Sequence, residues 1–264
     1  MYIRGLFLIG IAAFTVMSLC RLPAYGWGEK GHRTVAIIAD TYLTEQSREQ
    51  VRKLLPVGTT LADAAIWPDK EGRQIADLDR LHHVSIPDDA TGYDQERDCN
   101  ARNCMVEALK WFTSVIADAK APINVRLIAL RYVAHLVADM HQPLHAGRRE
   151  DRNGTDIIVS YRAQTNNLHL FWDINVVEME EGNPPDLAKK LVASITAEQH
   201  VEWKAGDPKW WTDESFRLSR SDAYALGQSM ELSDDYVATA LTIVRRRLVQ
   251  AGVRLGWLLN NAFK

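Results

Sequence analysis

Apolar residues at intervals of three and four positions run through most of the chain after residue 33. This spacing places apolar side chains on one face of an α-helix, and several of the runs stop at a proline. It predicts helices over residues 34–43, 45–55, 60–67, 105–119, 123–140, 184–195 and 233–259. Strand-like character is confined to residues 156–161, and residues 88–103 are polar and loop-like. The pattern therefore predicts an all-α, single-domain helical bundle with a minor strand or β-hairpin near 156–161.

The most informative of these runs, residues 123–140, contains His135 and Asp139 but no helix breaker. A spacing of four puts both side chains on one helix face, and the apolar residues around them predict that the helix is buried. Pro143 ends the helix, so His145 should lie near the same end. Two imidazoles and a carboxylate suit a divalent metal ion. A buried His–Asp hydrogen bond without a metal is the alternative.

A second pair with the same spacing, His169 and Asp173, occurs in the sequence NNLHLFWD. Two such pairs among only eight histidines favour metal binding over coincidence. His32, at the end of WGEKGH, either reaches a metal ion or caps the helix that follows. Asp69, in a Trp-Pro-Asp turn, is either a ligand or a turn residue, and Asp63 competes with it as a ligand.

Composition limits the kinds of partner that the protein can bind. The chain has 264 residues, of which 47% are hydrophobic, enough for one sizeable core. Its net charge is −3, so no general basic surface would hold it to nucleic acid, and a phosphate group would need a local site. The run of basic residues Arg245–Arg247 is most simply a solvated helix face.

The first 26 residues have the features of a secretory signal peptide. Arg4 precedes a 15-residue apolar run, which is short for a membrane span, and residues 24–26 fit a small-x-small cleavage site. An uncleaved anchor is the alternative. Cleavage would make Trp27 the first residue, and its amine, with a pKa of about 8, could bind a metal ion together with its carbonyl oxygen. We therefore expect a secreted or periplasmic protein.

Cys99 and Cys104 are the only cysteines after residue 26. Export places them in an oxidising compartment, which favours a disulfide between them. The alternative is a metal-binding pair, which the spacing C-x4-C also allows.

Five motifs follow one another along the chain: WGxxGH from residue 27, then WPD, LHHVSIP, HLVADMHQPLH and NLHLFWD. In this order and spacing they resemble the zinc-dependent single-strand nucleases of the S1/P1 type, relatives of the zinc phospholipases C. The resemblance spans residues 27–264 and implies a helical domain of the phospholipase C/nuclease type. It implies three zinc ions per chain and a disulfide between the two cysteines. It also implies hydrolysis of single-stranded DNA and RNA to 5′-phosphate products, and it allows 3′-nucleotidase activity.

Carried over residue by residue, the resemblance implies mixed histidine and carboxylate ligands for the zinc ions. The first ion would be held by Asp69, His82, His135 and Asp139, the second by His145, His169 and Asp173, and the third by Trp27, His32 and the shared Asp139. Such ligands suit catalytic zinc. The expected reaction is metal-assisted hydrolysis of a phosphodiester, with Asp69 orienting the attacking water.

Three predicted substrate contacts depart from the family pattern. His83 and Ser85 stand where related sequences carry an aromatic residue and an acid that grip a base. Gly72 stands where an arginine would contact phosphate, and Arg73 could replace it. In an extended segment adjacent side chains point to opposite faces, so His82 should face the interior and His83 should not.

Two other functions remain compatible with the sequence. A zinc phospholipase C would use the same ligands on a lipid phosphodiester, although the chain after residue 26 shows no apolar segment for membrane docking. A non-catalytic zinc-binding or nucleic-acid-binding protein would not turn over a phosphodiester. We expect a monomeric nuclease that acts on single-stranded nucleic acid and nucleotides and does not associate with membranes.

Overall fold

The computed structural model describes residues 26–264, except residues 76–77, residues 101–102 and the side chains of Arg73 and Asp79. The predicted signal peptide therefore lies, up to residue 25, outside the described residues. The longer helices are α1 (Gly28–Thr41), α2 (Glu45–Leu54), α3 (Leu61–Ile66), α5 (Met105–Ala117), α6 (Ile123–Met140), α9 (Pro184–Ala193), α10 (Ala197–Glu202), α11 (Pro208–Leu218) and α12 (Asp234–Ala262). The shorter elements are η1 (Glu71–Gln74), η2 (Asp79–His82), α4 (Gln95–Asp98), η4 (Pro143–Ala146), β1 (Ile158–Tyr161), β2 (Gln164–Asn167), α7 (Leu168–Leu170), η5 (Phe171–Asn175), α8 (Val176–Glu178) and η6 (Ser219–Ala223). The predicted all-α class is confirmed, and no described helix is both long and apolar enough to span a bilayer.

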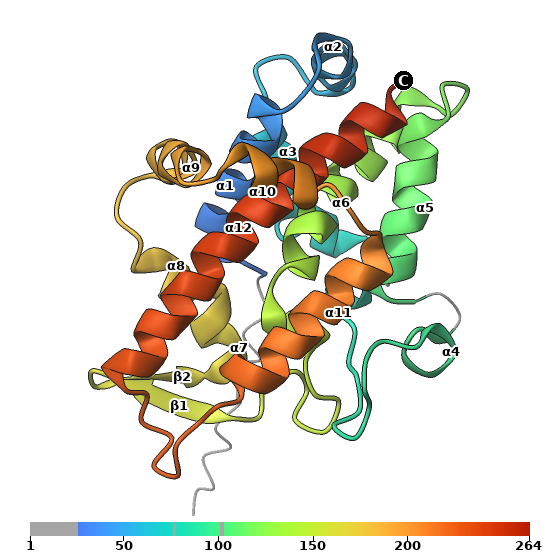
Figure 1. Cartoon of the computed structure of the whole chain (residues 1–264). Helices are drawn as coiled ribbons and strands as arrows, with labels where there is room; N and C mark the ends of the chain where they lie inside the picture. Colours follow the sequence, from blue (N-terminus) through green and yellow to red (C-terminus); the bar gives the residue numbers. More distant parts are fainter. Residues whose placement is uncertain (1–25, 76–77, 101–102) are drawn as a thin grey trace, which may run out of the picture.

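Helix α6 runs through the middle of the molecule, and α12 crosses it (Figure 1). It has the predicted bounds, and α1, α3, α5 and α12 pack against it. From Ala129 to Met140 every side chain except Arg131 is buried. His135 and Asp139 therefore lie deep inside the protein, where a charged group is costly unless it is paired or binds a metal ion.

Helices α1 and α12 approach each other closely because two glycines of α12 face α1. A Cβ atom on Gly252 would lie 2.3 Å from Cγ2 of Ile38, and one on Gly256 would lie 3.0 Å from the carbonyl oxygen of Ala39. A larger side chain at either position would push the helices apart. This contact fixes α1, which carries His32, against the core.

The prediction that Arg245–Arg247 form a solvated face is wrong for the last of them. Arg247 is 1% exposed, and it donates to Oε2 of Glu214 at 2.7 Å and to the carbonyl oxygen of His141 at 3.1 Å. Arg254 donates to Oε1 of the same carboxylate at 2.9 Å. Neighbouring residues on a helix point in different directions, so a run of charges need not share one surface. The network joins α11 and α12 to the end of α6.

The predicted strand is one half of a hairpin. β1 pairs with β2 in an antiparallel arrangement. Arg162 and Ala163 form the turn with φ of 47° and 63°, the left-handed values that a tight two-residue turn requires. The hairpin lies beside the start of α12 (Figure 1), where the backbone N–H of Leu232 donates to the carbonyl oxygen of Ser160 at 2.8 Å.

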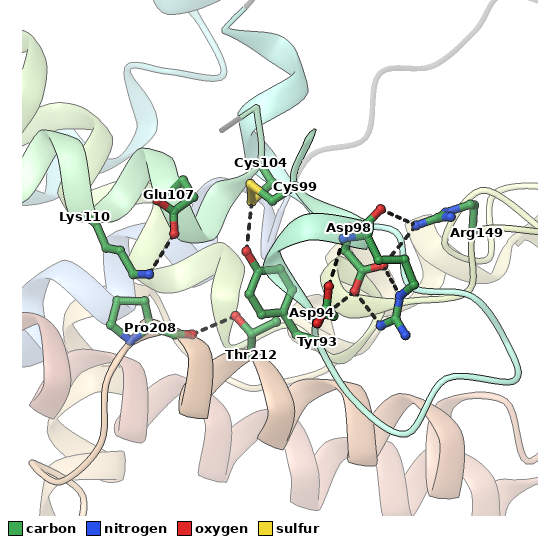
Figure 2. Close-up of a disulfide and its surroundings, with 11 residues drawn as sticks. Tyr93, Asp94, Asp98, Cys99, Cys104, Glu107, Lys110, Arg149, Pro208 and Thr212 are labelled. Carbon is green, nitrogen blue, oxygen red and sulfur yellow. Dashed lines mark hydrogen bonds and ion pairs between the residues drawn. A yellow bond between two sulfur atoms is a disulfide. The ribbon is translucent and has the colours of Figure 1, made fainter. Parts of the chain in front are cut away.

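The predicted disulfide between Cys99 and Cys104 is confirmed (Figure 2). It lies in the polar segment after η2, in which α4 forms a short helical turn. Next to it, Arg149 donates to Oδ1 of Asp98 at 3.0 Å. Because Arg149 follows η4, this bond ties the disulfide loop to the segment that leaves the end of α6.

Candidate metal centre

Eight side chains that were predicted as metal ligands come together in three groups. Within each group the candidate ligand atoms all lie within 4.8 Å of one another. The groups are His32, His135 and Asp139; Asp69, His82 and His135; and His145, His169 and Asp173. They come from α1, the turn after α3, η2, α6, η4 and the helical stretch α7–η5, so distant segments of the chain build one cluster.

Asp139 lies between the groups. Its Oδ2 is 3.1 Å from Nδ1 of His82 and 3.1 Å from Nε2 of His135. Its Oδ1 is 3.4 Å from Nε2 of His32 and 3.7 Å from Nδ1 of His145. The carboxylate is fully buried. One carboxylate thus faces histidines of all three groups, an arrangement that suits a bridging ligand.

The electrostatics of the cluster favour positive charge. Burial alone would raise the pKa of Asp139, but His135 and His145 outweigh it and lower that pKa well below its usual range. Burial would lower the pKa of His135, whereas Asp139 and Asp69 raise it to about 9. The pKa of His145 is likewise raised to about 9, because Asp139 and Asp173 outweigh burial. A divalent cation bound there would supply the charge that these carboxylates attract.

Three of the histidines are held by backbone carbonyl groups through Nδ1. The bonds are 2.7 Å from His135 to Ala65, 2.6 Å from His145 to His82 and 2.7 Å from His169 to Asn153. A bond of this kind fixes the plane of the ring and leaves Nε2 as the nitrogen that can bind a metal. The backbone around the cluster therefore presets the direction of these rings.

Several buried polar atoms of the cluster have no hydrogen-bond partner among the described residues. They are both ring nitrogens of His32, Oδ1 of Asp139, Nε2 of His145, Nε2 of His169 and Oδ2 of Asp173. An unpaired buried polar group costs about 1–3 kcal/mol, and native proteins rarely contain one. Coordination of a cation would satisfy these atoms. Imidazole nitrogens with carboxylate oxygens are a donor set that zinc takes, so the residues present fit a zinc centre.

His32 is not a helix cap, because α1 already begins at Gly28, earlier than predicted. The alternative interpretation of this residue is therefore wrong. His32 is fully buried inside α1, and its ring stacks on that of His135 with 3.9 Å between centroids and 6° between planes. The stacking places its unpartnered nitrogens beside the carboxylate of Asp139.

Trp27 anchors the backbone that precedes α1. It is fully buried, and its indole N–H donates to the carbonyl oxygen of Ala138 at 2.8 Å. A Cβ atom on Gly26 would lie 1.9 Å from Oδ1 of Asp139 and 2.7 Å from Nε2 of His32. The backbone at positions 26 and 27 therefore reaches the group that contains His32.

His169 and Asp173 lie on a helical stretch, as predicted, but its middle is the π-helical turn η5. Nε2 of His169 is 3.2 Å from Oδ2 of Asp173. Single π-helical turns often occur at functional sites. The spacing of apolar residues in the sequence cannot reveal a π-helical turn, because such a turn changes the direction of only a few side chains.

Gln142 is a residue of the cluster that was not predicted from the sequence. Its side chain is fully buried, and its amide nitrogen donates to Oδ1 of Asp173 while its oxygen accepts from the backbone N–H of Leu144. It thereby fixes one oxygen of Asp173 and ties the start of η4 to η5. The only signal in the sequence was the position of Gln142 within HQPLH.

Asp69, rather than Asp63, faces the cluster. Oδ1 of Asp69 is 3.7 Å from Nε2 of His135. Asp63 instead caps α3 by accepting from the backbone N–H of Thr60 at 2.9 Å, and it accepts from Arg33 at 2.8 Å. Arg33 and then Thr60 lower the pKa of Asp63 to about 2. The competing carboxylate is therefore occupied by structural contacts.

The three predicted substrate contacts differ in how the structure places them. The ring centroid of His83 is 6.5 Å from that of His145, with 85° between the planes. Ser85 lies further along the same segment, and its carbonyl oxygen accepts from Arg149 at 3.2 Å. The side chain of Arg73 lies outside the described part of the structure. Proximity to the cluster thus supports His83 most directly.

Residues 27–264 match the sequence profile of the family described as S1/P1 Nuclease. The chain is 30% identical to Endonuclease 2 of Arabidopsis thaliana, with 98% of each chain covered. It is 32% identical to Endonuclease 4 of the same plant, covering 90% of this chain and 89% of that one. It is 29% identical to Nuclease S1 of Aspergillus oryzae, covering 95% of this chain and 96% of that one.

Proposed function

This chain belongs to the S1/P1 nuclease family, and we propose that it is a zinc-dependent enzyme that cleaves single-stranded DNA and RNA. The activity of a nuclease follows from the family. The dependence on zinc is supported by the buried cluster around Asp139, in which six nitrogen and oxygen atoms of His32, Asp139, His145, His169 and Asp173 have no hydrogen-bond partner among the described residues. The relatives are named nucleases or endonucleases, which speaks against a zinc phospholipase C or a non-catalytic binding protein.

The proposed ligands are those implied by the motifs. One zinc ion would be held by Asp69, His82, His135 and Asp139, a second by His145, His169 and Asp173, and a third by His32, Asp139 and the amine and carbonyl oxygen of Trp27. The shared carboxylate of Asp139 would keep the first and third ions together. Gln142 would hold Asp173 in the direction that the second ion needs.

Bound zinc would supply positive charge to the phosphodiester and would lower the pKa of a water molecule to about 7. Asp69 would accept a hydrogen bond from the attacking water and so orient it toward phosphorus. Cleavage of the bond between phosphorus and the 3′ oxygen leaves a 5′-phosphate on one product. The same cleavage of a 3′-nucleotide would release phosphate, which is the proposed 3′-nucleotidase activity.

A preference for single strands is supported by the depth of the cluster. Seven of its eight side chains are buried, all except Asp69, so the sugar-phosphate backbone has to approach the protein closely. A flexible strand bends into such a site at little cost, whereas duplex DNA has a persistence length of about 50 nm. Single-stranded DNA and RNA are therefore the substrates that we propose.

We also propose that residues 1–26 direct export and are then removed, which would leave the amine of Trp27 free. The mature enzyme, residues 27–264, would act as a secreted or periplasmic monomer. The disulfide between Cys99 and Cys104 fits an oxidising compartment. The buried indole of Trp27 would hold the new amino terminus beside His32 and Asp139.

The test pairs a metal measurement with an activity measurement on the processed protein. We expect three zinc ions per chain and hydrolysis of single-stranded DNA and RNA that a chelator abolishes and added zinc restores. Duplex DNA should be cut more slowly, and phosphatidylcholine micelles should not be hydrolysed. Full activity of a metal-free preparation would overturn the zinc dependence. Three bound zinc ions without phosphodiester hydrolysis would indicate a non-catalytic protein.

A further inference from the structure

Helix α5 and the segment around η2 line a pocket of about 530 Å³ that is open to solvent and is not part of the cluster described above. Leu78 and Leu81 line it from one side, and Trp111 and Phe112 line it from α5. We call it the Trp111 pocket. Trp111 is 57% exposed, although a tryptophan side chain gains more than most from burial. The exposed indole is therefore available to a ligand.

The indole of Trp111 contacts a buried pair of stacked aromatic rings. Its ring centroid is 4.7 Å from that of Phe112, with 58° between the planes, and the ring of Phe112 lies 4.7 Å from that of Tyr132 with 9° between the planes. Phe112 and Tyr132 are buried. Tyr132 precedes His135 by three residues on α6, so the stack rests on the helix that carries the cluster. The edge of the exposed indole therefore rests on the buried core beside α6.

The Trp111 pocket adjoins the cluster through η2. Leu81, which lines the pocket, directly precedes His82, whose Nδ1 is 3.1 Å from Asp139. The Cα atoms of consecutive residues are about 3.8 Å apart. The short element η2 therefore contributes consecutive residues to the pocket and to the cluster.

The polar rim of the pocket is electrically balanced. Lys110 donates to Oε1 of Glu107 at 2.7 Å, and both side chains lie near the disulfide (Figure 2). A phosphate group would need a cation without such a partner. A partly apolar pocket with an exposed indole instead suits the flat face of a nucleobase. The carboxylate of Glu107 can also accept from the exocyclic amine that adenine, cytosine and guanine carry.

We propose that the Trp111 pocket is a stacking subsite for a nucleobase of the single-stranded substrate, beyond the nucleotide whose phosphodiester is cleaved. The proposal deepens the proposed function and rests on it. Stacking on an indole accepts any base and leaves the sugar-phosphate backbone free to continue toward His82. The subsite therefore strengthens the binding of long strands and has no effect on a dinucleotide too short to reach it.

The test compares Trp111→Ala and Trp111→Phe with the matched control Trp210→Ala. Trp210 is 60% exposed on α11, does not line the pocket, and donates to Glu214 at 3.2 Å. KM and kcat are measured on a DNA dinucleotide and on a single-stranded decanucleotide. We expect Trp111→Ala to raise KM for the decanucleotide about tenfold, the scale of one lost base–aromatic stack. Trp111→Phe should show a smaller rise, and kcat and the KM for the dinucleotide should not change.

Zinc content and the thermal midpoint of each variant establish that it is folded. An unchanged KM of Trp111→Ala for the decanucleotide would overturn the subsite. An equal loss on the dinucleotide, or the same loss in Trp210→Ala, would also overturn it, because the effect would then be general damage. Failure of the unsubstituted enzyme to cleave either substrate would refute the proposed function instead.

Discussion

An amino acid added before Trp27 should cost this enzyme a metal ion. The addition turns the amine of Trp27 into a peptide nitrogen, which would have to lose a strongly held proton in order to bind zinc. A terminal amine has a pKa of about 8 and can bind near neutral pH. The comparison needs three forms of the protein. One begins at Trp27, one begins at Gly26, and one begins at position 26 with the substitution Gly26→Ala.

The size of the effect can be worked out in two steps. Zinc held by four ligands contributes about 10–16 kcal/mol, so one lost ligand costs about 2.5–4 kcal/mol, or roughly a 60- to 700-fold weaker affinity. The alanine form has a second penalty, because its Cβ would lie 1.9 Å from Oδ1 of Asp139 and 2.7 Å from Nε2 of His32. Such overpacking costs about 1–3 kcal/mol, or roughly a further 5- to 140-fold.

Each form is produced as a fusion whose removal leaves the chosen first residue, and any purification tag is placed at the C-terminus. Zinc per chain is measured at limiting free zinc, and initial rates are measured on single-stranded DNA. We expect the zinc content to fall from three to two, with the alanine form binding the third ion most weakly. Equal zinc content and equal rates in all three forms would show that the amine of Trp27 is not a ligand.

Two substitutions test the cluster and its support. Asp139→Ala should lose two of the three zinc ions together, because its carboxylate faces histidines on both sides; metal analysis that still finds three ions contradicts the bridge. Burial would raise the pKa of Glu214, but Arg254 and Arg247 lower it. Its charge therefore stabilises the fold above the ordinary pKa of 4.5, and this contribution is lost as the pH falls through the lower folded value. In thermal unfolding, Glu214→Gln should reduce the loss of stability that occurs as the pH falls below 4.5. Parallel plots of the thermal midpoint against pH for the variant and the unsubstituted protein would refute the pairing of Glu214 with the two arginines.

The sequence alone was enough to predict seven of the nine longer helices in the described part of the chain and the residue types of the cluster, whereas α10 and α11 were not predicted. Helix α6 has the predicted bounds, and α2 ends one residue before its predicted end. Apolar spacing and prolines act over a few residues, so these elements follow from local interactions. The spacing of four also placed His135 and Asp139 on one face, where both point into the same cluster. The order of the motifs supplied the remaining ligand candidates.

Which polar groups meet depends on how distant helices pack against one another. His32 and His82 are far apart in the sequence, and both face Asp139 because α1 and η2 pack against α6. Arg247 is buried in a run of charges because α11 brings Glu214 to it. Helical periodicity is a local property, whereas a charged group can be buried only where another segment supplies its partner, since loss of water is costly without one.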